Sequence, residues 1–240
     1  ASIIDPQNGG FGAAPKITAL HNLLFLLRYW KRSKDAFALQ MVEETLQAMR
    51  MGGVFDHLGG GFHRYSTDAG WRVPHFEKML YDQAMMVMAY TEAYQATGKK
   101  EYARTVQEIL EYVLRDMTSL QGGFFSAEDA DSEGEEGAYY LWRADALKEV
   151  LDGEDFRLLI RLFDIYESGN FEAGRNILIA RSTFKDAASV LGISEVDLWG
   201  RWEGIRERLL AVREKRVHPP KDDKILADWN GLMIAALAKA

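Results

Sequence analysis

The hydrophobic residues of this chain follow two helical patterns that alternate along the sequence. Three segments are apolar nearly all round the helix: residues 17–30, 78–96 and 226–240. Three others carry a single apolar stripe: residues 36–51, 101–117 and 197–214. A helix that is apolar all round is buried on every side, whereas a striped helix covers another layer. The alternation therefore predicts an all-α fold with an inner ring of helices inside an outer ring, which is an α/α toroid. An irregular helical bundle is the alternative.

The connectors between these segments contain glycine pairs. Gly-Gly followed by an apolar residue occurs at 9–11, 52–54 and 122–124. Glycine permits positive φ at helix C-termini and in tight turns, and strand-like composition follows each pair, so we expect short β hairpins there. Two connectors, about 52–74 and 118–138, are long. Because they are rich in aromatic, histidine and carboxylate side chains, we interpret them as functional loops.

The composition excludes several classes of function. The 240 residues carry a net charge of −7 with scattered basic residues, so a nucleic-acid partner is not expected. No apolar run is long enough to span a membrane. The absence of cysteine excludes disulfides and thiolate sites, and it fits a cytoplasmic location. The first residues, 1–5, and the unterminated apolar run at 232–240 suggest a piece of a longer protein.

The segment 56–78 holds three of the five histidines. Pro74 suits the first position of the helix that we expect to follow. On that helix, His75, Lys78 and Asp82 would form one polar stripe on an otherwise apolar surface. Polar groups on a buried helix must be paired or face a water-filled cavity, so we expect this stripe to face the lumen. Histidine there would suit proton transfer near neutral pH.

Two other readings of this segment are open. A metal site formed by His57, His63 and His75 lacks the close pairing of known metal motifs, so no metal is predicted. Arg64 could clamp a carboxylate or phosphate through two hydrogen bonds, or it could only fix a loop.

A Lys–Asp pair recurs at the start of two apolar segments. Lys78 and Asp82 form the first pair, and Lys224 and Asp228 form the second. A spacing of four residues places both groups on one helix face. The pair is either functional or a salt bridge that fastens each inner helix to a neighbouring loop.

The segment 126–137 is acidic. It imitates part of a calcium-binding loop, but Tyr140 stands where the loop requires glutamate, so a calcium site is rejected. Glu128, Asp129 and Asp131 could instead accept hydrogen bonds from sugar hydroxyls or act as an acid/base pair. A solvated acidic loop is the alternative, and it suits Glu133 and its neighbours better.

Several motifs, in order, resemble one protein family. They are Gly-Gly-Phe-Gly-x-x-Pro-Lys at 9–16, the runs Gly-Gly-Gly-Phe-His-Arg-Tyr-Ser-Thr-Asp and Pro-His-Phe-Glu-Lys-Met-Leu-Tyr-Asp-Gln-Ala after Asp56, Ser-Ala-Glu-Asp-Ala-Asp-Ser at 126–132, and Asp-Trp-Asn-Gly-Leu-Met at 228–233. They are similar to the thioredoxin-fused, spermatogenesis-associated-protein-20-like proteins, and the resemblance covers essentially the whole chain.

This resemblance implies a thioredoxin-like domain followed by an (α/α)6 barrel similar to N-acylglucosamine 2-epimerases and six-hairpin glycosidases. Only the barrel is matched here, so we expect residues 1–240 to form one truncated barrel domain without the thioredoxin-like domain and the last barrel helices. In the epimerase-like relatives, histidines and an arginine at the barrel mouth transfer protons, and Arg64, His63 and His75 are nearest in kind. An incomplete ring exposes apolar surface, so we expect self-association through its open edge.

We therefore predict a carbohydrate-active domain, either a sugar epimerase or isomerase or a glycoside hydrolase. The alternatives are a noncatalytic carbohydrate- or peptide-binding module and a scaffold. The expected partner is a small-molecule ligand such as a sugar, without a cofactor. All candidate residues should surround one concavity. The candidate catalytic residues are His63, Arg64, His75, Lys78, Asp82, Glu128 and Asp129. The candidate ligand-binding residues are Tyr65, Trp71, Asp131, Lys224, Asp228, Trp229 and Asn230.

Overall fold

The computed structural model describes residues 4–240, which are mostly helical with short antiparallel strands in the connectors. Residues 1–3, which the predicted domain includes, lie outside the described residues. The first helical hairpin consists of α1 (Leu20–Ser33) and α2 (Ala36–Met51), and the second of α3 (Leu80–Thr97) and α4 (Lys100–Asp116). Helix α9 (Ala227–Lys239) packs on α3.

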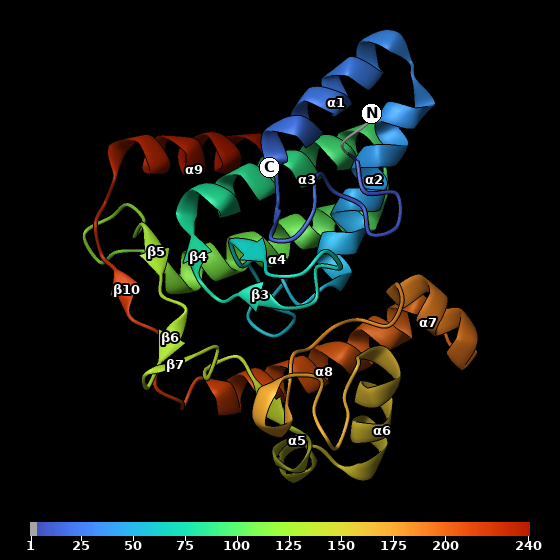
Figure 1. Cartoon of the computed structure of the whole chain (residues 1–240), viewed down its shortest axis with the longest axis vertical. Coiled ribbons are helices and arrows are strands. Elements are labelled where there is room, and N and C mark those ends of the chain that lie inside the picture. Colours follow the sequence, from blue (N-terminus) through green and yellow to red (C-terminus); the bar gives the residue numbers. More distant parts are fainter. Residues whose placement is uncertain (1–3) are drawn as a thin grey trace.

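These five helices form two layers. In one layer α1 and α9 both pack on α3, and in the other α2 packs on α1 and α4 packs on α3, with α4 below α3 in Figure 1. This arrangement of helical hairpins is part of an α/α toroid, which confirms the predicted fold class. No helix within residues 4–240 has the length and apolar character needed to cross a lipid bilayer.

A second group of helices lies beyond α4, at the lower end of Figure 1. Its long helix, α8 (Glu195–Arg213), was expected as an outer helix. It packs against three short helices that the sequence patterns did not indicate: α5 (Ala144–Val150), α6 (Gly153–Leu162) and α7 (Phe184–Leu191). Each short helix carries only a few apolar residues, too few to establish a helical period.

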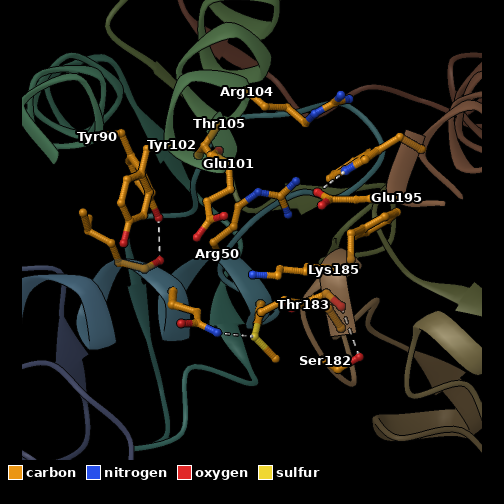
Figure 2. Close-up of a pocket in the computed structure, with 16 residues that line it drawn as sticks. Arg50, Tyr90, Glu101, Tyr102, Arg104, Thr105, Ser182, Thr183, Lys185 and Glu195 are labelled. Atoms are coloured by element: carbon orange, nitrogen blue, oxygen red, sulfur yellow. Dashed lines mark hydrogen bonds between the residues drawn. The ribbon is translucent and has the colours of Figure 1, made fainter. Parts of the chain in front are cut away.

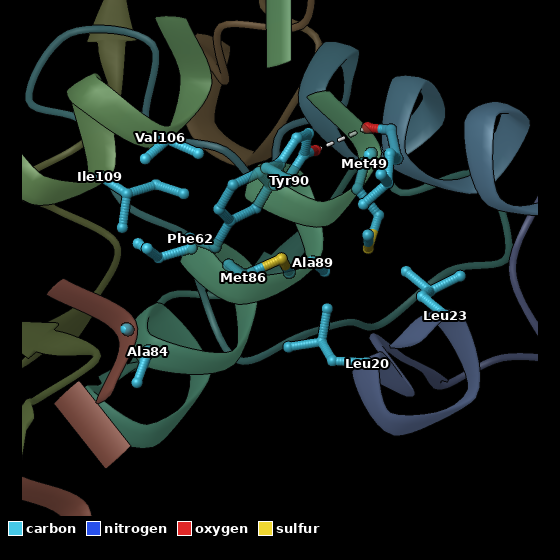
Figure 3. Close-up of a cluster of buried hydrophobic side chains, with 14 of the residues drawn as sticks. Leu20, Leu23, Met49, Phe62, Ala84, Met86, Ala89, Tyr90, Val106 and Ile109 are labelled. Atoms are coloured by element: carbon cyan, nitrogen blue, oxygen red, sulfur yellow. Dashed lines mark hydrogen bonds between the residues drawn. The ribbon is translucent and has the colours of Figure 1, made fainter. Parts of the chain in front are cut away.

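Each helical group has its own hydrophobic core. The first core lies between α1, α2, α3, α4 and α9, and Figure 3 shows its centre around Tyr90 and Met86. The Tyr90 hydroxyl donates a hydrogen bond to the Leu46 carbonyl at 2.7 Å, which satisfies its only polar group in this apolar setting. The second core contains Trp202 and Leu209 of α8 together with residues of the three short helices.

Two three-stranded antiparallel sheets join the connectors. In one, β2 (Tyr65–Ser66) pairs with both β1 (Lys16–Ile17) and β3 (Pro74–His75). In the other, β5 (Ala127–Glu128) pairs with both β4 (Lys78–Met79) and β10 (Lys221–Asp222). Two strand pairs complete the connectors: β6 (Asp131–Ser132) with β7 (Glu135–Glu136), and β8 (Trp142–Arg143) with β9 (Arg175–Asn176). The 3-10 turn η1 (Glu172–Gly174) precedes β9.

The expected polar stripe on one helix is wrong. Pro74 and His75 lie on β3 and Lys78 lies on β4, so only Asp82 is helical. Strand pairing with distant segments overrides the local helical spacing, and side chains on a strand point alternately to opposite faces. As a result, His75 remains partly exposed, whereas Lys78 is buried.

The expected difference in burial between inner and outer helices holds only for α3. Ten of the 18 residues of α3 are buried, against four of 14 in α1 and three of 13 in α9. The outer helices α2 and α4 each bury six residues, so α1 and α9 are not the more buried ones. The reason is that α3 has neighbours on several sides, whereas α9 packs mainly on α3.

One hairpin recurs at the entrance to two inner helices. Before α1, the Asp5 N–H donates to Gly10 O at 2.9 Å, and Lys16 reaches the Asp5 carboxylate at 2.6 Å. Before α3, the Asp56 N–H donates to Gly61 O at 3.0 Å, and Lys78 reaches the Asp56 carboxylate at 2.9 Å. Lys78 therefore forms a salt bridge that fastens the start of α3 to a neighbouring loop, and its partner is Asp56 rather than Asp82.

The glycine pairs serve two different purposes. The pairs at 9–10 and 122–123 have positive φ as expected, but Gly52 does not, with φ of −69°. At Gly53 the requirement is space, because a Cβ atom there would lie 2.0 Å from the Arg72 carbonyl oxygen. Glycine thus lets the 71–72 backbone pass directly against the end of α2.

Candidate functional site

The structure separates the candidate residues into a buried ionic network and a group on the surface. The buried network centres on Asp56. Its carboxylate accepts hydrogen bonds from both terminal nitrogens of Arg213, at 2.7 and 2.8 Å, and from Lys78 Nζ at 2.9 Å. Burial alone would raise the pKa of Asp56, but the two cations outweigh it and hold this pKa well below its usual range.

His63 and Glu128 lie in the same interior. His63 donates from Nδ1 to the Phe76 carbonyl at 2.9 Å, and burial, aided by the charge of Lys78, lowers its pKa to about 3. The imidazole is therefore neutral at physiological pH. Glu128 accepts a short hydrogen bond from the Tyr140 hydroxyl. Lys78 and Glu128 are held by hydrogen bonds to Asp56 and Tyr140. His63 lines a small internal cavity of about 20 Å³ together with Phe76 and Arg213, so these three candidates belong to the buried network.

Two candidate ligand-binding residues also have structural roles. Trp71 is fully buried, and its indole N–H donates to the Asn8 carbonyl at 3.1 Å, so it presents no face to a sugar. Asn230 uses its amide to bond both backbone groups of Phe124, at 2.7 and 2.9 Å. Aromatic and amide residues were expected at a site because they suit sugar binding, but here packing and backbone pairing occupy both.

Five other candidate residues meet three further side chains at the first sheet and the start of α3. We call this set the surface cluster, and it consists of Arg64, Tyr65, His75, Glu77, Tyr81, Asp82, Glu136 and Trp229. Arg64 pairs with Glu77 at 3.0 Å, and the other side of Glu77 faces His75 Nε2 at 3.6 Å. His75 Nδ1 in turn lies 2.8 Å from the Glu136 carboxylate. Within the cluster, Arg64, Glu77, His75 and Glu136 thus form a row in which basic and acidic side chains alternate.

The order of these groups follows from strand register. Tyr65 on β2 is directly opposite His75 on β3, and their rings stack with centroids 5.0 Å apart. Glu77 follows His75 by two residues, and Glu136 comes from the β6–β7 hairpin, where it is opposite Asp131. Aromatic cross-strand pairs of this kind stabilise a sheet and fix the direction of the side chains.

Asp82 is the most unusual member of the surface cluster. It lies in the first turn of α3, the residue is only 7% exposed, and Oδ2 has no hydrogen-bond partner within the described part of the chain. Burial raises its pKa to about 7, while the charge of Arg64 opposes the rise and that of Glu77 adds to it. Perturbed carboxyl groups of this kind are typical of functional sites.

Two aromatic side chains from the first turns of α3 and α9 contact each other near Asp82 in the sequence of α3. Tyr81 precedes Asp82, and its ring meets that of Trp229 edge-on with centroids 4.8 Å apart. Burial raises the pKa of Tyr81, and the neighbouring Asp82 adds to this effect, so the phenol stays protonated. Both rings are partly exposed. They provide an apolar surface next to a group that can bind or release a proton.

The remaining candidates lie outside the surface cluster. Asp129 is exposed, and its carboxylate accepts from the Asp131 N–H at 3.2 Å. Lys224 precedes α9 and pairs with Asp222 at 2.7 Å, while Asp228 accepts from the Trp229 N–H at 3.0 Å. Within residues 4–240, none of these three side chains contacts the surface cluster by a hydrogen bond or ion pair. The Lys224–Asp228 pair repeats the sequence spacing of Lys78 and Asp82, but the two lysines have different roles in the structure.

Three members of the surface cluster were missed. Glu77 and Tyr81 flank residues that were singled out, and a strand period of two would have placed Glu77 on the face of His75. Glu136 was interpreted as part of a solvated acidic loop, and nothing in the sequence indicates its contact with His75, 61 residues away. Across residues 4–240, no three His, Asp or Glu side chains are arranged to hold a metal ion.

Comparison with solved structures returns enzymes built as α/α toroids. A cellobiose 2-epimerase from Bacillus thermoamylovorans is 13% identical and aligns over 93% of this chain and 72% of its own, with a TM-score of 0.49. A sugar epimerase from a ruminal bacterium is 14% identical over all of this chain and 77% of its own, with a TM-score of 0.48. No protein-family model matches the chain.

Sequence comparison identifies the homologues. Human spermatogenesis-associated protein 20 is 38% identical over 262 residues, which cover 98% of this chain and 33% of the human protein. The mouse protein of the same name is 38% identical with the same coverage. The chain is therefore homologous to spermatogenesis-associated protein 20, as its motifs predicted, and it spans about a third of the length of these relatives.

Proposed function

We propose that the surface cluster binds a sugar and that Asp82 exchanges a proton with it. The observation that carries this proposal is the Asp82 carboxyl group, which is buried, unpaired at Oδ2 and raised in pKa to about 7. An acid–base catalyst works best when its pKa lies near the working pH, because both protonation states are then populated. A purely structural carboxylate would be paired, as Asp56 is.

The neighbours of Asp82 suit a polyhydroxylated ligand. Tyr81 and Trp229 offer partly exposed rings for the apolar face of a sugar ring. Arg64, with 45% of its side chain exposed, and Glu136, with 48%, supply charged donors and acceptors for hydroxyl groups. Mixed aromatic and charged surroundings of this kind bind a sugar through both its faces and its edges.

Proton transfer at carbon fits the geometry better than hydrolysis. A carboxylate at Asp82 would remove the proton from the carbon next to the carbonyl of an open-chain sugar, leaving an enediolate, and the resulting acid would return a proton to that intermediate. One group whose pKa lies near neutrality can perform both steps. Retaining or inverting hydrolysis needs two carboxyl groups with separate roles, whereas Glu77 is already paired with Arg64.

The proposal is tested by solvent exchange. The protein is incubated with glucose, mannose, N-acetylglucosamine or cellobiose in D2O, and deuterium at the carbon next to the carbonyl is followed by NMR. We expect incorporation with at least one sugar, and a loss of ~100-fold or more in Asp82→Asn, which is the usual scale for removing an acid–base group. Asp129→Asn is the control, since Asp129 is exposed and outside the cluster.

A noncatalytic sugar-binding module is the second candidate. The paired arrangement of Arg64, Glu77, His75 and Glu136 favours it, because these groups are already neutralised by one another. A sugar that raises the melting temperature of the wild type but not of a Tyr81→Ala variant, without any deuterium incorporation, would support binding alone. Exchange that is equal in wild type and Asp82→Asn would contradict the catalytic role.

A further inference from the structure

A small cavity lies inside the molecule, next to the buried network around Asp56. It is lined by His63 and Arg213 on one side and by apolar groups such as Phe76 and Leu178 on the other, and all of these residues are buried. The space inside it is about 20 Å³. One water molecule needs about 10–15 Å³ of such space. The cavity therefore has room for a single water-sized molecule.

This cavity differs from the cleft at the seam between α2, α4 and α8. Figure 2 shows that basic side chains, Arg104 and Lys185, and acidic ones, Glu101 and Glu195, all line that cleft. Because both signs of charge are spread along it, the cleft selects no ligand by charge. The internal cavity is more selective, since its unpaired groups are one donor and one acceptor.

Arg213 supplies the donor. Its two terminal nitrogens hold the Asp56 carboxylate at 2.7 and 2.8 Å. The third nitrogen of the guanidinium, Nε, is buried and has no hydrogen-bond partner within residues 4–240. A buried donor that is left unpaired lowers the stability of the fold, and more so when it belongs to a charged group. The Nε–H group of Arg213 therefore requires an acceptor.

His63 supplies the acceptor. Its Nδ1 faces the Phe76 carbonyl at 2.9 Å, and since a carbonyl can only accept, Nδ1 carries the proton. Burial lowers the pKa of His63 to about 3, so the ring is neutral and Nε2 keeps its lone pair. The other histidine of the cavity, His57, is already bonded at both nitrogens, to Arg50 at 3.2 Å and to the Gly52 carbonyl at 3.1 Å.

The donor and the acceptor lie close to each other. The centroid of the Tyr140 ring is 4.7 Å from that of His63 and 5.3 Å from the guanidinium carbon of Arg213. Since both groups line a space about as wide as one water molecule, one molecule in that space can reach both.

The charges around the cavity disfavour ions. A cation would meet the guanidinium of Arg213, and an anion would meet the Asp56 carboxylate and the lone pair of His63, which line the same space. A neutral molecule that both donates and accepts satisfies the two unpaired groups. Water has this chemistry and this size.

We propose that the cavity is a binding site for one water molecule, which accepts a hydrogen bond from Arg213 Nε and donates one to His63 Nε2. Buried waters make roughly two to four such bonds and are costly to remove. The bridge would join α8 to the segment before β2. Through His63 it would also support Phe76, which lies between His75 and Glu77 of the surface cluster. The site does not depend on the proposed sugar chemistry.

The test observes the guanidinium directly. In protein labelled with 15N and 13C, the Nε–H resonance of Arg213 is assigned through its own side-chain carbons, and water-selective NOE and ROE spectra are recorded. We expect an NOE between this proton and water with the sign of a long-lived complex. Arg206 is the matched control, because its Nε donates to Glu203 at 2.9 Å and should show no such NOE.

A variant tests the acceptor. His63→Phe removes Nε2 and fills part of the cavity, so we expect the NOE to Arg213 to disappear. Oxygen-17 relaxation dispersion should also count one long-lived water fewer than in the wild type. His21→Phe, at an exposed histidine of α1, should keep the wild-type count. Folding of both variants is checked by their amide spectra.

Three results would overturn the proposal. The first is the absence of an NOE between water and Arg213 Nε–H in the wild type. The second is a 15N spectrum in which His63 carries its proton on Nε2, because this nitrogen could then not accept. The third is an equal count of long-lived waters in the wild type and His63→Phe. If His63→Phe does not fold, the first two measurements, both on the wild type, decide the question.

Discussion

The Lys78 ammonium group lies 2.9 Å from the Asp56 carboxylate, and both side chains are almost completely buried. The aromatic rings of Tyr112 and Tyr140 lie 4.1 and 4.9 Å from the same ammonium group. Burial lowers the pKa of Lys78, whereas Asp56 and Glu128 oppose this effect. The lysine that sequence spacing placed among catalytic groups is thus a fixed structural cation.

Removing that cation should destabilise the fold strongly. Lys78→Met leaves Asp56 with one buried cation instead of two, and breaking a buried pair from one side typically costs about 3–5 kcal/mol. Urea unfolding measures the loss. Lys224→Met is the matched control, because its partner Asp222 is exposed and little change is expected. Equal stability of the two variants would contradict the structural role of Lys78.

Asp82 should make folding less favourable as the pH rises. Its pKa is raised from 3.8 to about 7 in the folded state. Between these values the folded state keeps a proton that the unfolded chain releases, so stability falls as pH increases through this window. The full difference is on the order of 4 kcal/mol. The free energy of unfolding of Asp82→Asn should therefore rise relative to that of the wild type from pH 4 to pH 7. Above pH 7 the difference between the two proteins should stay constant.

The control for this prediction is the pH dependence of a second variant. Asp129→Asn, at an exposed carboxylate, should follow the wild type at every pH. Chemical unfolding at half-unit pH steps gives the difference directly. If Asp82→Asn loses stability relative to wild type as pH rises, the carboxyl group is stabilised in its charged form and the assigned direction is wrong.

Substitution by alanine should lower the stability of the fold more at Gly60 than at Gly98. Both have positive φ, of 79° and 71°. At Gly98 a Cβ atom would meet nothing within 4 Å, so Gly98→Ala should cost only the backbone penalty of about 1–2 kcal/mol. At Gly60 the Cβ would lie 2.3 Å from Glu108 O, which adds ~1–3 kcal/mol of overpacking. Equal unfolding midpoints for the two variants would mean that the loop moves aside.

The outer surfaces of α1 and α9 should promote self-association. Phe25 is 65% exposed and Ile234 is 62% exposed, and Tyr29 stacks on Phe25 at 6.2 Å. Exposed apolar groups of this kind tend to find partners. Sedimentation velocity should show a concentration-dependent oligomer that Phe25→Ser/Ile234→Ser disperses. A wild type that remains a monomer at all concentrations would refute this expectation.

The helical layers could be predicted from the sequence because they depend on a local period. Six of the nine helices within residues 4–240 follow apolar patterns long enough to show it. The strands before α3 could not be predicted, because His75 and Lys78 have helical spacing but pair with strands from distant connectors. Long-range pairing leaves no signal in the spacing of nearby residues.

The residues of the candidate site could be predicted only in part, again because contacts between distant residues leave no local signal in the sequence. His75, Arg64, Asp82 and Trp229 were identified by residue type and do lie in the surface cluster. Trp71 and Glu128 have the same chemistry but are buried, and burial depends on neighbours such as Asn8 and Tyr140 that only the folded chain brings close. Residue type indicates what a side chain can do, whereas its neighbours decide what it does.

The two cations that hold Asp56 come from very different places in the sequence. Lys78 is 22 residues away, so this contact closes a short loop, whereas Arg213 is 157 residues away on α8. Closing the longer loop costs more chain entropy and requires the second core to be docked. If α8 separated, Asp56 would keep Lys78 as its one cation, together with the N–H groups of Leu58 and Gly59. The two cores are therefore coupled energetically, and the chain should unfold in one transition rather than in two.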